Sequence, residues 1–317
     1  MMHFHAWEGL MKKSLVWVLC AFAALSLAAC SGSGSGASSA AASSQAASSE
    51  AAPSDASSGN TSEGASAETS GNKADSSASG ATPTIDEIKK RGEFVTMTAT
   101  GFPPFEYLGA DGQPAGVDVD MGKLVADKLG VKYKVLDMDF GLLVEALKNG
   151  KGDMIAAGMT VTPEREEQVD FTDTYAQAGQ AILVPADSTI AGADDLKKDG
   201  VTVTVQANTT GDLYVQNDLG IASPLQFKNA VECASALAAG KADAAVIDDV
   251  AAKALVKTYD GKLKVLPELA TKEDYAFAIA KGHEDLVEFI NGVIEEAKAD
   301  GTIDKLMEQH TEASSQG

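Results

Sequence analysis

The order of apolar segments predicts an α/β protein with two α/β halves. In the first half, segments typical of strands and helices alternate as strand, helix, strand, helix, strand, at residues 93–98, 118–129, 131–136, 142–148 and 153–157. The alternation begins again after Gly179. Because such an order favours a parallel sheet covered by helices on both faces, we expect ligands to bind at the carboxyl ends of the strands.

Local residue patterns support the elements of the first half. Residues 118–129 are amphipathic and end at Gly130, the residue type that most often follows a helix C-terminus. Residues 131–136 alternate between polar and apolar side chains, as a half-buried strand does. Asn149 and Gly150 should stop the second helix, and a short apolar strand follows them.

The second half and the tail follow the same logic. We expect strands at 180–184, 201–205 and 244–247, and helices at 194–198, from about 211, at 230–239 and at 250–259. The tail holds one expected strand, 275–280, and two helices within 284–309 that break at Asp300 and Gly301. A single strand cannot form a sheet by itself, so the tail should dock on one of the halves.

The N-terminal residues have the pattern of an export signal followed by a tether. Residues 1–30 are expected to be a signal peptide, because Lys12 and Lys13 precede an apolar run and a small-residue approach to Cys30. The Leu-Ala-Ala-Cys ending resembles a bacterial lipoprotein cleavage box, so Cys30 is expected to carry the lipid, palmitate included; the alternative is a plain signal with an accidental cysteine. Translation is expected to start at Met11 rather than Met1. Residues 31–82 consist mainly of Ser, Ala and Gly, which predicts a disordered tether.

Composition and motif content exclude several functions. The formal net charge of −21 argues against a nucleic-acid partner, whose phosphates require a basic surface. His283 and His310 have no cysteine or histidine nearby in the sequence, and no nucleophile motif or phosphate-binding loop is present. We therefore expect no metal, no cofactor and no catalytic residue. Cys233 is the only cysteine after Cys30, which leaves no partner for an intramolecular disulfide.

Arginine usage identifies the first candidate binding residue. Arg91 and Arg165 are the only arginines of the chain, which otherwise uses lysine. Arg165 follows the predicted strand 153–157 and a Thr-Pro pair suited to begin a helix. A guanidinium can hold a carboxylate through two parallel hydrogen bonds, which an ammonium cannot do. The alternative is a solvated arginine paired with Glu166 or Asp170.

Two aspartates follow the strand 244–247. Asp249 lies nearer the next helix and is the natural N-cap, which would free Asp248 to accept a hydrogen bond from an ammonium group. The alternative is that both are surface carboxylates.

Two loops offer weaker candidates. The turn 206–211, which contains Thr209 and Thr210, lies between a strand and a helix and would direct backbone N–H groups at an anion, although most such loops bind nothing. Phe102 and Phe140 lie in loops after predicted strands. They could form the walls of a ligand pocket, or they could belong to the hydrophobic core.

Residues 82–311 resemble the extracellular solute-binding proteins of ABC transporters for polar amino acids. The matching stretches are GFPPFEY, GVDVDMGKLVADKLGV, GDMIAAGMTVTPEREEQVDFTDTY, VTVQANTTG, ADAAVIDD and ADGTIDKL. The resemblance implies a type II periplasmic-binding-protein fold with two α/β lobes and two hinge strands. It assigns residues 83–176 plus 275–317 to lobe 1 and residues 177–274 to lobe 2.

The resemblance also implies a role for each candidate residue. Arg165, Thr160 and the backbone amides near Thr209 and Thr210 would bind the α-carboxylate of a free amino acid. The Asp248 carboxylate, the Gly158 carbonyl and the Thr160 hydroxyl would bind the ammonium. Phenylalanine rings would flank the ligand's side chain. The ligand-binding residues so implied are Arg165, Asp248, Thr160, Gly158, Phe102, Phe140, Thr209 and Thr210.

The implied protein is a monomer on the outer face of the cell membrane. Its partners would be an amino acid ligand, an ABC transporter permease with its ATPase, and the membrane through the lipid anchor only. Ala99 stands where related proteins that hold a long polar or cationic side chain often have an acid, so we expect a neutral ligand side chain in preference to arginine or lysine. Asn208 replaces the usual glycine of its turn, and asparagine tolerates the left-handed backbone conformation better than most residues.

Two other functions would use the same lobes. A dehydratase-type enzyme would need a general acid in the cleft, for which Glu106 and Asp120 are the candidates. A sensor would instead present its closed form to a receptor. Static ligand-holding groups favour the binding protein over the enzyme, and the lipid anchor favours a transporter over a receptor.

Overall fold

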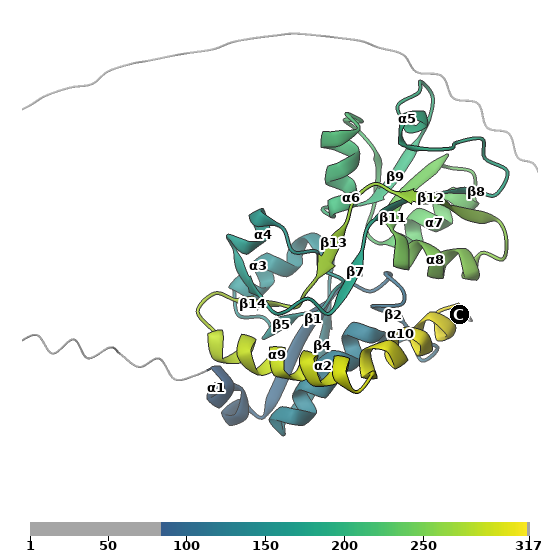
Figure 1. Ribbon diagram of the computed structural model, residues 1–317. Coiled ribbons are helices and arrows are strands. Elements are labelled where there is room, and N and C mark those ends of the chain that lie inside the picture. The colour runs from purple at the N-terminus through teal and green to yellow at the C-terminus, as the bar shows by residue number, and fades with distance from the viewer. Residues whose placement is uncertain (1–83, 316–317) are drawn as a thin grey trace, which may run out of the picture. The chain divides into compact units, whose positions relative to one another are not determined.

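A computed structural model describes residues 84–315 of the chain. The predicted signal peptide, the lipidated Cys30 and the tether lie outside the described residues. The described part forms two lobes, each built around one sheet, and two extended strands run between them (Figure 1).

The first lobe contains a five-stranded mixed sheet. Its strands lie in the order β4 (Lys132–Asp137), β1 (Glu93–Thr98), β5 (Met154–Ile155), β14 (Ala278–Ala280) and β6 (Val169–Phe171). β1 is parallel to β4 and to β5, whereas β14 is antiparallel to both of its neighbours. The remaining elements of this lobe are α1 (Thr84–Arg91), β2 (Tyr107–Leu108), β3 (Pro114–Ala115), α2 (Val117–Leu129), η1 (Phe140–Leu142), α3 (Leu143–Lys148), α4 (Pro163–Glu166), α9 (Glu284–Ala299) and α10 (Thr302–Ala313).

The second lobe repeats the plan with a second five-stranded sheet. The strand order is β10 (Leu225–Phe227), β9 (Val203–Gln206), β11 (Ala244–Asp248), β8 (Gln180–Pro185) and β12 (Leu263–Leu269). β9 is parallel to β10 and β11, and β8 is antiparallel to β11 and β12. The helices are α5 (Ala193–Leu196), α6 (Thr210–Leu213), η2 (Tyr214–Asp218), α7 (Ala230–Ala238) and α8 (Asp249–Thr258).

Two short strands connect the lobes. β7 (Ala176–Ala178) and β13 (Glu273–Tyr275) pair with each other in antiparallel register, with Asp274 opposite Gln177. The predicted strand 275–280 is therefore wrong as a single element. Its first residue belongs to this connection and its last three to the sheet of the first lobe, because the chain must leave one sheet before it enters the other.

Buried aromatic side chains fill the first lobe where the connecting strands enter it. Tyr175 stacks on Phe277 with ring centroids 4.3 Å apart, and Phe105 meets Tyr275 edge to face at 5.1 Å. Such pairs stabilise a core by about 0.5–1.5 kcal/mol beyond the burial of their area.

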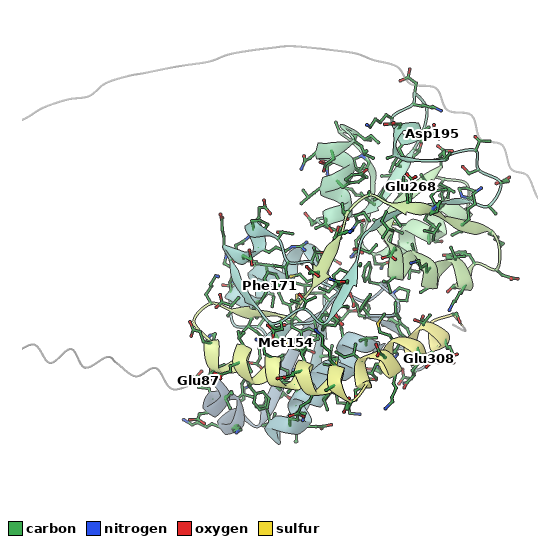
Figure 2. The ribbon with its side chains drawn as sticks, viewed as in Figure 1. Glu87, Met154, Phe171, Asp195, Glu268 and Glu308 are labelled. Atoms are coloured by element: carbon green, nitrogen blue, oxygen red, sulfur yellow. The ribbon has the colours of Figure 1, made fainter. Side chains whose placement is uncertain are left out.

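The core of the first lobe also contains aliphatic side chains. Met154 of β5, labelled in Figure 2, is fully buried there.

The C-terminal segment docks on the first lobe, as predicted. β14 enters the sheet of that lobe, and α9 and α10 pass along its lower side (Figure 1). His310 of α10 is buried, and its two ring nitrogens lie 3.0 Å from a carboxylate oxygen of Asp120 and 2.9 Å from the hydroxyl of Tyr107. These bonds join the last helix to α2 and β2.

Two absences apply to the described residues. None of the helices within 84–315 is both long enough and apolar enough to span a bilayer. In the same range, no three acidic, histidine or cysteine side chains converge in a way that could hold a metal ion.

Candidate ligand-binding site

Side chains of both lobes line a narrow pocket. Its lining includes all eight residues predicted from the sequence. The full lining is Phe102, Glu106, Phe140, Ala157, Gly158, Thr160, Arg165, Gln206, Thr209, Thr210 and Asp248.

Strand topology explains why residues so far apart in the chain meet here. The lining segments follow β1, β4 and β5 in the first lobe, and β9 and β11 in the second. Within each lobe these strands are parallel, so their carboxyl ends lie on one edge of the sheet. The two edges face each other across the pocket, the position that an alternating strand-helix order predicts for a ligand.

Arg165 lies on the short helix α4 and is half-buried. Thr162 caps this helix by accepting a hydrogen bond from the Arg165 N–H, and Pro163 is its first residue, as predicted. The guanidinium donates to the backbone oxygen of Thr160 at 2.8 Å and lies 5.2 Å from the centre of the Phe140 ring. The alternative pairing with Glu166 or Asp170 is wrong: no carboxylate of the described residues lies within ion-pair distance of Arg165, and Asp170 pairs with Lys281.

Burial and neighbouring charges act on Arg165 in opposite directions. Burial lowers the pKa of the guanidinium, and the nearby carboxylates of Glu273 and Asp248 oppose that shift. An arginine stays protonated in proteins, so the group presents a fixed positive charge to the pocket. Its free N–H donors can take a carboxylate.

Asp248 presents the opposite charge from the second lobe. Only 6% of the residue is exposed, and its Oδ1 atom is buried without a hydrogen-bond partner among the described residues. Burial, and next the charge of Glu273, raises the pKa of Asp248 to about 7. A buried, unpartnered acceptor of this kind is satisfied by an ammonium donor.

The predicted capping role of Asp249 is wrong. α8 begins at Asp249 itself, and Asp248 occupies the N-cap position without a side-chain capping bond. The Asp249 carboxylate instead accepts from the Gly179 N–H at 3.2 Å and pairs with Lys253. It is held by the segment that leaves the connecting strand β7, which sequence position alone could not show.

The turn after β9 has the predicted left-handed residue. Asn208 has φ of 65°, which confirms that asparagine supports the turn in place of glycine. α6 begins at Thr210, so the N–H groups at this end have no acceptor within the helix. The Thr209 hydroxyl donates to the Gln206 carbonyl and accepts from the Asp212 N–H, so only the backbone of this turn is available to an anion.

Phe102 belongs both to the core and to the pocket wall. The residue is 7% exposed, packs in the core of the first lobe and also lines the pocket. It closely approaches Gly158, whose φ is 50° and where a Cβ atom would lie 2.9 Å from the ring. The Gly158 N–H donates to a carboxylate oxygen of Asp118 at 2.8 Å. The wall is therefore fixed from behind by a buried acid.

Glu106 supplies an acid that the argument from Ala99 did not include. Ala99 packs in the core of the first lobe and does not line the pocket, whereas Glu106 does. Burial, followed by the charge of Asp118, raises the pKa of Glu106 well above its usual range. The expectation of a neutral ligand side chain, which rests on Ala99, stays a prediction. Of the two candidate general acids, Asp120 bonds to His310 and does not line the pocket.

One residue of this region, Glu273, could not be identified from the sequence. It lies on the connecting strand β13, and its carboxylate accepts a hydrogen bond from the Thr160 hydroxyl at 2.5 Å. Nothing in the local sequence Lys272-Glu273-Asp274 distinguishes it from an ordinary surface acid. Its position depends on how the two lobes and their connection meet.

Ligand binding through Asp248 should depend on pH. An ammonium pairs with the ionised carboxylate, and a raised pKa means that the ionised fraction falls as the pH drops below about 7. We expect amino acid affinity to be about 25-fold higher at pH 7.5 than at pH 5.5. Calorimetry at both pH values measures this. Asp248→Asn should bind weakly at both, with a flatter profile, and an unchanged wild-type affinity would contradict the ammonium role.

Comparison with known proteins identifies the family. The sequence matches the bacterial extracellular solute-binding proteins, family 3, over residues 94–313. The chain belongs to this family. The two-lobed type II periplasmic-binding-protein fold predicted from the sequence is thereby confirmed.

Relatives of this solute-binding protein are named as binders of different amino acids. The glutamine-binding protein of Geobacillus stearothermophilus is 34% identical over 218 residues, which are 66% of this chain and 82% of that protein. The arginine-binding extracellular protein ArtP of Bacillus subtilis is 32% identical over 236 residues, 73% of this chain and 90% of that one. The crystal structure of AncCDT-1, an ancestral amino acid-binding protein and precursor of cyclohexadienyl dehydratase, has a TM-score of 0.68 at 37% identity and covers 72% of this chain and 99% of its own.

Proposed function

We propose that this solute-binding protein captures one free amino acid between its lobes and delivers it to an ABC importer. The observation that carries the proposal is the placement of opposite charges in one small pocket. Arg165 comes from the first lobe and Asp248 from the second, and both line it. A zwitterion offers a carboxylate and an ammonium at a fixed separation, and it can satisfy both at once.

The division of these charges between the lobes connects binding to closure. A ligand in contact with both charges stabilises the closed arrangement by its differential affinity for that state. Charged hydrogen bonds contribute about 1.5–3 kcal/mol each, so the two ends of one ligand suffice for a substantial shift. Strands β7 and β13 would serve as the hinge, with residues 83–176 plus 275–317 moving against 177–274.

Glu106 is the group in the pocket that would select the ligand's side chain. Its Oε2 atom is buried with no hydrogen-bond partner among residues 84–315. A side chain that carries N–H donors would satisfy this oxygen, whereas an apolar side chain would leave it unsatisfied. Glutamine, histidine, arginine and lysine are therefore expected to bind more tightly than valine or leucine.

The proposed setting is the outer face of the cell membrane, where a lipid on Cys30 would hold the protein. Residues 31–82 would then act as a flexible chain with a root-mean-square span of ~40 Å. The proposed transport partners are the permease and ATPase of an ABC importer, served by a monomeric binding protein. Mass spectrometry of the membrane-extracted protein would show an N-terminal diacylglyceryl cysteine, and an unmodified precursor would contradict the anchor.

A thermal-shift screen of the twenty amino acids tests the proposed function. A ligand at 100 times its dissociation constant adds ~2.7 kcal/mol of stability. For a domain of this size, that gain should raise the melting temperature by about 5–10 °C. We expect a small set of amino acids with donor-bearing side chains to produce the shift. The ligand recovered after incubation should be chemically unchanged; a product that has lost water would favour a dehydratase, and no shift with any amino acid would contradict binding.

A further inference from the structure

The carboxylate of Glu273 collects hydrogen bonds from both lobes and from the connection between them. Its side chain is buried, with 7% of the residue exposed. Oε2 accepts from the hydroxyls of Thr160, at 2.5 Å, and Thr210, at 2.8 Å. Oε1 accepts from the Thr271 hydroxyl at 2.8 Å and from the side-chain amide of Gln180 at 3.1 Å.

All four of these partners are neutral donors. None of the ion pairs among residues 84–315 includes Glu273. Arg165 lies beyond ion-pair distance, although the charge of Glu273 still acts to raise the pKa of its guanidinium. An ionised carboxylate accepts at both oxygens and can satisfy four donors, whereas a protonated carboxyl or an amide would direct one of its own hydrogens at a donor. The arrangement therefore requires a charged, acceptor-only group at this position.

These bonds set the direction of the hydroxyl group of Thr160. A hydroxyl has one proton, and Thr160 gives its proton to Glu273, so the oxygen can only accept further bonds. The residue lines the pocket beside Arg165, whose guanidinium is bonded to the Thr160 carbonyl. The pocket side of this hydroxyl therefore presents lone pairs, which suit an ammonium and repel a second acceptor such as a carboxylate.

Thr210 links the same carboxylate to the second lobe. Its hydroxyl donates to Oε2 and accepts from the Gln180 amide at 3.2 Å. One carboxylate oxygen thus receives a threonine hydroxyl from each lobe. Opening of the lobes would break at least one of these bonds, so the full set of partners exists only in the closed arrangement.

We infer that Glu273 is a positioning residue for ligand recognition, which fixes the Thr160 hydroxyl as an acceptor for the ligand's ammonium when the lobes close. The inference rests on the proposed function, because it assigns a device within the same site. Glu273 itself does not line the pocket; it acts through Thr160 and Thr210. A residue that only holds the connecting strands in place would not need to contact the two pocket threonines.

A double-mutant cycle between Glu273→Gln and Thr160→Val tests the inference. The probe is the L-amino acid, of the twenty, that raises the wild-type melting temperature most. We expect each single variant to bind this amino acid ten- to hundredfold more weakly than the wild type, as measured by calorimetry. The double variant should lose no more than about threefold in affinity relative to the single variant that binds more weakly. Thr160→Ser keeps the hydroxyl and should retain affinity within threefold of the wild type. Independent, multiplicative losses would overturn the inference.

The pH dependence of ligand affinity provides a second test, because the expected result depends on the negative charge of Glu273. Asp248 is faced by Glu273, Tyr275, Glu106 and Arg165, and removal of one negative neighbour should lower its pKa. The midpoint of the pH dependence of affinity should therefore move to lower pH in Glu273→Gln. Asp274→Asn is the matched control, since it makes the same charge change on an exposed residue of the same strand. It should change neither the affinity nor the midpoint, and an unmoved midpoint in Glu273→Gln would overturn the inference.

Two wild-type controls separate this inference from the proposed function. If none of the twenty amino acids binds the wild type, the proposed function fails before any variant is measured. If the wild type binds and the cycle is multiplicative, only the role of Glu273 fails. Circular dichroism and urea unfolding show whether Glu273→Gln is folded. If it is misfolded, the ligand affinities of Thr160→Val and Thr160→Ser are compared instead. Equal affinities in these two variants would show that the hydroxyl has no role and would overturn the inference.

Discussion

Replacement of Arg165 by alanine should lower amino acid affinity by about 2–5 kcal/mol, because a buried ligand carboxylate would lose its charged partner. The guanidinium is half-buried, lines the pocket and stacks over Phe140. Arg165→Lys should retain part of the affinity, since it keeps the charge but loses the planar fork and the stacking. Calorimetry with the amino acid identified by thermal shift measures both variants.

The chain contains a matched control for this experiment. Arg91, its other arginine, pairs with Asp153 at 2.5 Å and does not line the pocket. Arg91→Ala removes the same charge and should leave affinity within a factor of about two, because a surface ion pair contributes roughly 0–1 kcal/mol to stability and nothing to the pocket. Equal affinities of Arg165→Ala and wild type would show that the ligand carboxylate is bound elsewhere.

Gly116→Ala should destabilise the folded protein by about 3 kcal/mol or more, the largest stability effect that we expect from a single methyl group. The residue has φ of 138°, and an added Cβ atom would lie 2.0 Å from the backbone oxygen of Phe105. That oxygen accepts the Asp118 N–H at 3.0 Å, which attaches the loop 101–107 to the start of α2. Phe102 and Glu106 lie on this loop, so ligand affinity should fall together with stability.

Gly130→Ala separates steric overlap from backbone strain. Gly130 also has a positive φ, 73°, but an added Cβ atom would meet no other atom within 4 Å. Its substitution should therefore cost only about 1–2 kcal/mol, from the left-handed conformation alone. Urea unfolding, monitored by tyrosine emission, measures the stability loss of both variants. Tyrosine is the reporter because the two tryptophans, Trp7 and Trp17, precede Cys30 and so belong to the predicted signal peptide. Equal losses in the two variants would contradict the close approach at Phe105.

Most elements of the fold could be predicted because central strands and amphipathic helices leave a local pattern. The strands missed from the sequence include β6, β10 and β12, and each of them lies at an edge of its sheet. Edge strands expose many of their side chains, and three of the seven residues of β12 are exposed. The apolar run or strict alternation that identifies a strand is therefore absent. The strands that connect the lobes could not be predicted either, because β7 and β13 have only three residues each, too few to show a periodic pattern.

The sequence alone determined the charges of the site, the two-half architecture and the residues at the ends of the central strands. Arg165, Asp248 and their neighbours could be identified because the carboxyl ends of parallel strands meet wherever a strand-helix order repeats. The tertiary structure alone decided that Glu106, rather than Asp120, lines the pocket. It also decided that Glu273 has four donors, because burial and donor geometry arise only where the lobes and their connecting strands come together.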